Sequence, residues 1–232
     1  MGLVITVVRT ALILSAPGST LAAALVASLA LHGWVCTSIT GPLDSELERL
    51  KPIIVILEDE QGRLRQLAAD AWARGNVFIG SSRTLDTMIR ACERGALALD
   101  QDMPFLRLVS AVAEALADHG EQGRDRSVAA LAALRVRRLD LVRLGSLTPR
   151  ERDVLFDLAD GRVVADIATD RFRSISTVRS QVQSLLTKLH ASSQIVAVAV
   201  ANRAGHRTWP EGKLLVGFIN FDDDAPVRRS EE

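Results

Sequence analysis

Short apolar runs alternate with amphipathic stretches over the first half of the chain. The apolar runs have the length of β-strands and fall at Ala11–Ser15, Val35–Ile39, Ile53–Leu57, Val77–Ser81 and Ala96–Leu99. The stretches that follow them predict helices at Thr20–His32, Asp44–Leu50, Gln61–Arg74, Thr84–Arg94 and Pro104–Asp118. The third run contains no polar residue, which is typical of a strand buried on both faces of a parallel sheet. The alternation therefore predicts a doubly wound α/β domain over residues 10–118.

The pattern changes over residues 119–146, which we interpret as a helical linker. His119–Gly123 interrupts the alternation, and Val128–Leu144 then predicts a basic helix. Its apolar positions include Leu131, Leu134, Leu139 and Val142. A helix packed on its own domains and a helix that pairs with its copy in a dimer both fit this pattern.

The segment that follows the linker predicts a cluster of helices. Thr148 can cap a helix, Pro149 suits the first helical position, and Glu151 completes a capping box with Thr148. A short helix is expected at Val163–Asp170, and a longer one from the cap at Ser174 to about residue 189. A short helix, a tight turn and a longer helix match a helix-turn-helix, whose second helix enters the major groove of DNA.

The longer helix has two different faces. At 100° per residue, its apolar positions share one face: Val178, Val182, Leu185 and Leu189. The opposite face carries short polar groups, an amide and one arginine: Ser176, Arg179, Ser180, Gln183 and Thr187. Solvated helix faces usually mix acids and bases, whereas a surface that approaches phosphates and base edges excludes carboxylates. This face therefore predicts contact with double-stranded DNA.

The charge distribution supports that interpretation. The chain has 28 basic and 28 acidic side chains, but the stretch from residue 171 to residue 210 has six basic residues and no acidic one. Such a local basic run is expected of a nucleic-acid-binding surface, although a solvated helix face would also produce it. The length of 232 residues is sufficient for two small domains.

Several spaced motifs resemble the LuxR/FixJ-type DNA-binding domain. The first two motifs are Leu147–Leu155 and Asp166–Ala168. Three more have gaps: Ser174 and Thr177–Arg179; Leu185, Leu186, Lys188 and Leu189; and Ser193, Gln194, Ala197 and Val198. The resemblance covers residues 147–204 and leaves 205–232 as a C-terminal tail. It implies an all-α domain of four helices, in which the third contacts DNA and the fourth, here Ser193–Arg203, often forms a dimer contact.

The resemblance also assigns roles to individual positions. Arg179, Ser180 and Gln183 match base-facing positions, while Thr177 and Lys188 match positions that commonly meet phosphates. Arg173 stands where the family usually has an apolar residue, which either weakens the packing of the turn or adds a phosphate contact.

The fourth helix is apolar nearly all round, so part of its surface is expected to meet a partner. We expect the contacts of a homodimer at Ile195, Val198 and Ala201.

The α/β domain resembles the receiver of two-component response regulators, and the resemblance implies an acceptor position at Glu58. Phosphoryl transfer in that family needs acidic residues after the first strand and a lysine after the fifth. Here the first strand is followed by Ala16-Pro17, and Met103 occupies the lysine position. One or two carboxylates at a single strand end make a poor Mg²⁺ site. We therefore expect a degenerate receiver that works without phosphorylation.

Two interpretations of Glu58 follow from the sequence. It is either a permanently acidic residue at the acceptor position or an ordinary surface glutamate beside Asp59 and Glu60.

No other chemistry is indicated by the sequence. Pro17–Thr20 lacks the glycine pattern of a dinucleotide or P-loop site, and no nucleophile–histidine set is visible. Cys36 and Cys92 are far apart and are expected to be buried free thiols. We expect no catalytic residues, no metal and no cofactor; an unknown small-molecule or protein ligand of the N-terminal domain stays open.

The apolar segment Leu21–Cys36 is shorter than the roughly 20 residues of a membrane span, so we expect a cytoplasmic protein without membrane contact. We have no functional interpretation of the β-rich segment Gly2–Val8 or of the apolar tail at 214–221.

Three functions compete on this basis. The first is a sequence-specific DNA-binding transcription regulator that does not depend on phosphorylation. The second is a conventional response regulator that is phosphorylated near Glu58 or Asp59. The third is a protein-interaction module that binds an acidic partner through the basic surface at 171–208.

Overall fold

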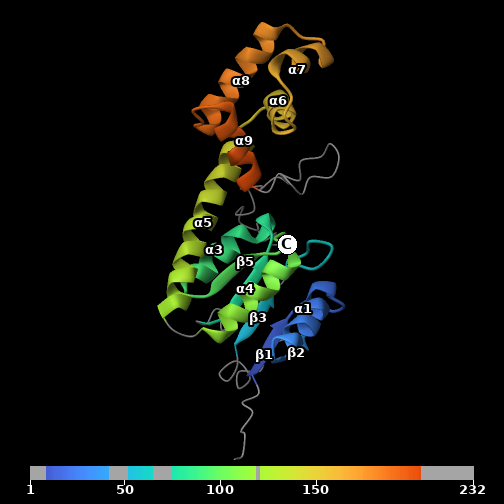
Figure 1. Cartoon of the computed structure of the whole chain (residues 1–232), viewed down its shortest axis with the longest axis vertical. Coiled ribbons are helices and arrows are strands. Elements are labelled where there is room, and N and C mark those ends of the chain that lie inside the picture. Colours follow the sequence, from blue (N-terminus) through green and yellow to red (C-terminus); the bar gives the residue numbers. More distant parts are fainter. Residues whose placement is uncertain (1–8, 42–51, 65–74, 119–120, 205–232) are drawn as a thin grey trace, which may run out of the picture. The chain divides into compact units, whose positions relative to one another are not determined.

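The computed structural model describes residues 9–41, 52–64, 75–118 and 121–204. The chain divides into two compact units, Met1–Leu139 and Asp140–Glu232. The division falls inside the expected linker. Figure 1 shows the elements of each unit.

The first unit is built on a five-stranded sheet in which all pairs are parallel. In spatial order the strands are β2 (Trp34–Ile39), β1 (Arg9–Leu14), β3 (Ile53–Ile56), β4 (Val77–Gly80) and β5 (Leu97–Asp100). Register places Leu12 beside Ile53 and Ile54 beside Val77. Every residue of β3 is buried, as its unbroken apolar run predicts. The expected α/β fold is confirmed.

Helices α1 (Thr20–Leu31) and α4 (Phe105–Ala117) share an apolar cluster with one face of the sheet (Figure 1). Helix α3 (Leu85–Glu93) follows a short 3₁₀ turn at Ser82–Thr84 and contacts β4 and β5. Its stripe of Leu85, Met88, Ile89 and Cys92 is buried. These three helices agree with the predicted ones to within one residue at each end.

The helix expected at Gln61–Arg74 is wrong in its first turn. Asp59 and Gly62 form a tight turn, with Gly62 N donating to Asp59 O at 2.9 Å, and Leu64 forms an antiparallel bridge with Glu58. Gly62 has a φ of 75°, which suits a glycine in a turn and not a helix. Residues 65–74, the helix expected at Asp44–Leu50, the segment Gly2–Val8 and the tail from 205 lie outside the described residues.

Helix α5 (Glu121–Gly145) is longer than the expected Val128–Leu144, because it already includes Gly123. The arginines of its first part pair with acids of the first unit: Arg126 with Glu114, Arg135 with Glu93, Arg137 with Asp100 and Arg138 with Asp86. The basic composition of the predicted linker is therefore explained by ion pairs to α4, α3 and β5.

The second unit is all-α and contains α6 (Pro149–Ala159), α7 (Val164–Asp170), α8 (Ile175–Leu189) and α9 (Gln194–Arg203). Its core includes the predicted apolar face of α8, namely Val178, Val182, Leu185 and Leu189. Leu144 and Leu147 belong to the same core, so the last turn of α5 is part of this unit.

No single described helix is long and apolar enough to cross a membrane. One pair of helices, α8 with α9, passes the criterion by length and composition alone, with a bend of 55° between them. Cys92 is buried and Cys36 is half-buried, and both are free thiols. Burial raises the pKa of each thiol.

Candidate nucleic-acid interface

Helix α6 begins with the predicted capping box. Thr148 Oγ1 accepts a hydrogen bond from Glu151 N at 3.3 Å, and Glu151 Oε2 accepts one from Thr148 N at 2.7 Å. Pro149 occupies the first turn, where its missing N–H costs nothing. The start of α6 is therefore fixed at Pro149.

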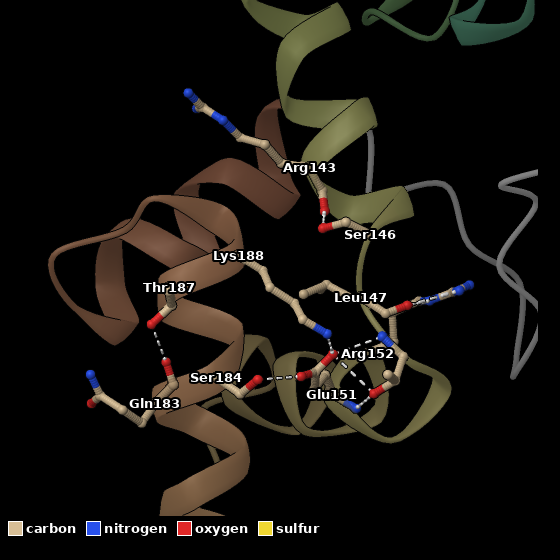
Figure 2. A network of polar contacts seen from close by, with 10 residues as sticks. Arg143, Ser146, Leu147, Glu151, Arg152, Gln183, Ser184, Thr187 and Lys188 are labelled. Atoms are coloured by element: carbon tan, nitrogen blue, oxygen red, sulfur yellow. Dashed lines mark hydrogen bonds and ion pairs between the residues drawn. The ribbon is translucent and has the colours of Figure 1, made fainter.

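The buried carboxylate of Glu151 also joins α6 to α8, as Figure 2 shows. Ser184 Oγ donates to Glu151 Oε1 at 2.6 Å, and Lys188 Nζ lies 2.8 Å from Oε2. Burial opposes ionisation, but the hydrogen bonds from Lys188, Ser184 and Thr148 outweigh it and lower the pKa of Glu151 to about 2. The two contacts from α8, those of Ser184 and Lys188, fix how α8 is oriented on α6.

A second cluster of ion pairs holds the turn between α7 and α8. Arg171 Nε lies 2.7 Å from Asp157 Oδ2, and its Nη1 lies 3.2 Å from Asp153 Oδ2. Arg162 Nη1 lies 3.0 Å from the other oxygen of Asp157. The hydrogen bond that Arg171 donates to Asp157 is the main cause that raises the pKa of Arg171. Arg171 therefore anchors the turn and is not available to a ligand.

Three of the five described basic residues of the run are neutralised in the same way. Lys188 pairs with Glu151, Arg171 with Asp157, and Arg203 Nε lies 2.8 Å from the buried Asp140 Oδ2. Arg173 and Arg179 have no carboxylate partner among the described residues. The free positive charge of the run is thus concentrated at the start of α8.

Helix α8 begins at the N-cap Ser174, whose Oγ accepts from Thr177 N at 3.1 Å. The polar face predicted to meet DNA is exposed: Ser176, Thr177, Arg179, Ser180, Gln183 and Thr187. Lys188 is half-buried beside Glu151, and Arg173 is half-buried in the turn. We call the surface formed by the six exposed residues the α8 face. It contains five of the seven residues expected to contact DNA.

A shallow open groove runs between this face and the start of α6. It is lined by Thr148, Pro149, Arg150, Glu151, Thr177, Ser180, Gln181 and Ser184. Arg150 is exposed there and was not among the residues expected to bind DNA. The signal in the sequence was its place in the first turn of α6, directly after the cap at Thr148, in the predicted DNA-binding domain.

The expected dimer contacts of α9 have different surroundings. Ile195 is 82% exposed, Val198 is half-buried against the core, and Ala201 is fully buried inside it. The exposed apolar surface of α9 therefore lies at Ile195 and Val196, near its N-terminus.

Glu58 is buried at the carboxyl edge of the sheet, so its interpretation as an ordinary surface glutamate is wrong. Its Oε1 accepts a hydrogen bond from Ser81 N at 2.8 Å, and its backbone bridges to Leu64. The sequence places Glu58 among acids and so suggests a surface, but the bridge folds the following turn back over it. The side chain therefore ties the end of β3 to the end of β4.

The two acids after Glu58 are engaged as well. Asp59 accepts from Arg63 N at 2.8 Å and from Gln61 N at 2.9 Å, and the backbone hydrogen bond from Arg63 is the main cause that lowers its pKa. Glu60 Oε1 accepts from Thr20 N at 2.7 Å, which lowers the pKa of Glu60. Each carboxylate thus caps a turn or a helix start.

Two further acids at this edge are Asp100 and Asp102. Asp100 forms an ion pair with Arg137. Burial, and then the charge of Asp100, raises the pKa of Asp102. Among the described residues, no group of three His, Cys, Asp or Glu side chains is arranged to hold a metal ion.

Comparison with known proteins identifies the second unit. Residues 145–201 match the family model GerE, described as bacterial regulatory proteins of the luxR family. The chain therefore carries a LuxR-type helix-turn-helix domain in its second unit.

Among individual proteins, the chain is 28% identical over 193 residues to the response regulator RamR of Streptomyces coelicolor. The aligned region covers 83% of this chain and 81% of RamR. Two solved structures of similar length also match. Full-length FixJ from B. japonicum has 19% identity, covers 85% of this chain and 98% of its own, and gives a TM-score of 0.37. RcsB from Salmonella enterica serovar Typhimurium, solved bound to a promoter, has 16% identity, covers 84% and 98%, and gives a TM-score of 0.40.

Proposed function

We propose that the protein is a sequence-specific transcription regulator that binds double-stranded DNA through the α8 face. The observation that carries this proposal is the exposed, acid-free surface of α8 inside a LuxR-type domain. Arg179 is the free cation of that face, and its neighbours Ser180 and Gln183 can donate to and accept from base edges. We infer no catalytic role and no cofactor.

The other expected contacts form the border of this surface. Ser176, Thr177 and Arg173 lie at the start of α8, where hydroxyl and guanidinium donors suit phosphate oxygens. Arg150 extends the same border along the groove. Lys188 remains a predicted phosphate contact. Its ammonium group already contacts Glu151, so any phosphate would share that group with the carboxylate.

We further propose that the receiver-like unit acts without phosphorylation. The carboxylates of Glu58, Asp59 and Glu60 each accept backbone hydrogen bonds that fix their positions. Among the described residues, no group of three His, Cys, Asp or Glu side chains is arranged to hold the metal ion that phosphoryl transfer needs. A switch needs contacts that differ between two states, and a lysine that would pair with a new phosphoryl charge is replaced by Met103. A small molecule or a protein partner is then the signal to look for.

A homodimer that uses Ile195 and Val196 of α9 completes the proposal, since a dimer would place two α8 faces on two half-sites. We propose that it acts in the cytoplasm, where the DNA of bacteria lies.

Binding of the full-length protein to duplex DNA tests the main proposal. Selection from a random duplex library should enrich one sequence, and the enriched duplex should bind at least 10³-fold more tightly than bulk DNA at about 0.15 M salt. Equal affinity for all duplexes, or no binding at any salt concentration, contradicts the proposal. Binding only to an acidic protein would favour the interaction-module alternative.

A further inference from the structure

Phe172 occupies an unusual position in the turn between α7 and α8. It is 97% exposed, the highest value among the large apolar side chains that the structure describes. A phenyl ring in water gains nothing for folding, because its apolar area stays hydrated. The ring is therefore available to a partner outside the domain.

The backbone at Phe172 ends helix α7. Its φ is 51°, in the left-handed region that glycine and asparagine adopt far more readily than an aromatic residue. The turn is nevertheless well fixed, because Phe172 N donates to Thr169 O at 3.1 Å and Arg173 N donates to Ala168 O at 2.9 Å. Arg171 is held by Asp157 on the preceding side. The ring is thus projected outward from a rigid turn.

The surroundings of the ring are those of the α8 face. Phe172 lies two residues before the N-cap Ser174, and the stretch from Arg171 to Leu189 contains no acidic residue. The free cations nearest in sequence are Arg173 and Arg179. A recognition helix contacts base edges with its N-terminal residues, so a residue just before its N-cap lies at the wall of the major groove. The apolar groups found there are the C5-methyl of thymine and the carbons of deoxyribose.

We propose that Phe172 contacts DNA and packs its ring on a thymine methyl group or a deoxyribose at the margin of the binding site. This inference rests on the proposed DNA-binding function. It adds an apolar contact to a surface that otherwise consists of polar side chains, and it gives a role to a ring that the fold leaves exposed.

The test compares the two non-glycine residues with positive φ in the described part of the chain, which flank the same helix. Phe172 precedes α8 and His190, also with a φ of 51°, ends it. Phe172→Gly removes the ring and relaxes the backbone, so the thermal midpoint should stay equal or rise while affinity for the selected duplex falls about tenfold. His190→Gly should relax the backbone alike and leave DNA affinity within about twofold.

Two further measurements separate the outcomes. Phe172→Leu, which keeps an apolar side chain, should recover part of the lost affinity. The thymines of the selected duplex are then replaced by uracil one at a time. If the ring contacts a methyl group, one replacement should lower the DNA affinity of the wild type and leave that of Phe172→Gly unchanged. If no replacement does so, the ring packs on a deoxyribose. A folded Phe172→Gly variant with wild-type affinity would overturn the inference but not the proposed function. Failure of the wild type itself to bind would reject the proposed function.

Discussion

Lys188 and Glu151 lie on different helices, with the lysine Nζ 2.8 Å from the Oε2 of the carboxylate. The same carboxylate caps α6 through Thr148 and accepts from Ser184 (Figure 2). One acidic side chain therefore both starts α6 and sets the orientation of α8 on it. A residue that the sequence marks as a phosphate contact thus also belongs to the internal framework of the domain.

This arrangement predicts a pH-dependent contribution to stability. The pKa of Glu151 is about 2 in the folded state and near 4.5 when unfolded, so the contribution is present above pH 4.5 and is lost as pH falls toward 2. Glu151→Gln should lower the free energy of unfolding at pH 7 by about 2 kcal/mol and flatten its dependence on pH below 5. Urea unfolding of the full chain at several pH values measures both.

The exposed pair Arg135–Glu93 provides the control for that experiment. Glu93→Gln removes a carboxylate from the surface, so it should change the free energy of unfolding by at most about 1 kcal/mol. Equal losses in the two variants would contradict a special role for Glu151.

DNA recognition should depend on Arg179. If its guanidinium group contacts a guanine, Arg179→Ala should cost about 1–3 kcal/mol of binding free energy and relax the preference at one base pair. Lys188→Ala should weaken binding to all sequences about equally, by loss of a phosphate contact, and should also lower stability because it leaves Glu151 without its cation.

Titrations against a set of single-base variants of the selected duplex measure both effects. Arg124→Ala is the matched control, because Arg124 is exposed on α5 in the first unit. Unchanged affinity in folded Arg179→Ala and Lys188→Ala would refute the assignment of the α8 face.

Activity should not respond to phosphodonors. Incubation with Mg²⁺ and acetyl phosphate should leave the intact mass and the DNA affinity unchanged. Glu58→Gln should alter DNA binding only modestly, because its amide oxygen can still accept from Ser81 N. Glu58→Leu leaves that buried donor unpaired and should lower the free energy of unfolding by about 1–3 kcal/mol. A stable gain of about 80 Da on the first unit with tighter DNA binding would establish the conventional response-regulator alternative.

Dimer formation should depend on the exposed start of α9. Ile195→Asp places a charge on a side chain that is 82% exposed, so it should weaken dimerisation and DNA binding without loss of stability. Ala201→Asp would bury a charge in the core and should unfold the second unit instead.

Sedimentation of the full chain distinguishes these results. Leu31→Asp, at a residue of α1 that is 88% exposed, is the matched control and should leave the dimer intact. A wild type that is monomeric on DNA with a single half-site would refute the dimer.

The local parts of this structure could be predicted from the sequence. The capping box at Thr148, the cap at Ser174 and the buried strand Ile53–Ile56 depend on neighbours within a few residues, which periodicity and spacing report directly. Burial of Glu58 could not be predicted, because it depends on a bridge to Leu64 in place of the first turn of the expected helix.

The pairing of charges was equally beyond the sequence. Arg171, Lys188 and Arg203 find their partners 14, 37 and 63 residues away. A count of basic residues therefore overstates the charge that a ligand would meet. The same count missed Arg150, which lies outside the basic run but beside the α8 face.

The internal pairing of these cations has a consequence for the way the protein would search a chromosome. A DNA-binding surface gains sequence-independent affinity by displacing counterions from phosphates, and each free cation contributes about one unit to the salt dependence of binding. In the described part of the second unit, Arg150, Arg173 and Arg179 have no carboxylate contact, and Arg152 is held by the carbonyl oxygen of Leu147. Few cations there are free to displace counterions, so such affinity should be low. The regulator would then leave random DNA quickly, sample sites by repeated dissociation more than by sliding, and depend on base contacts to remain at its operator.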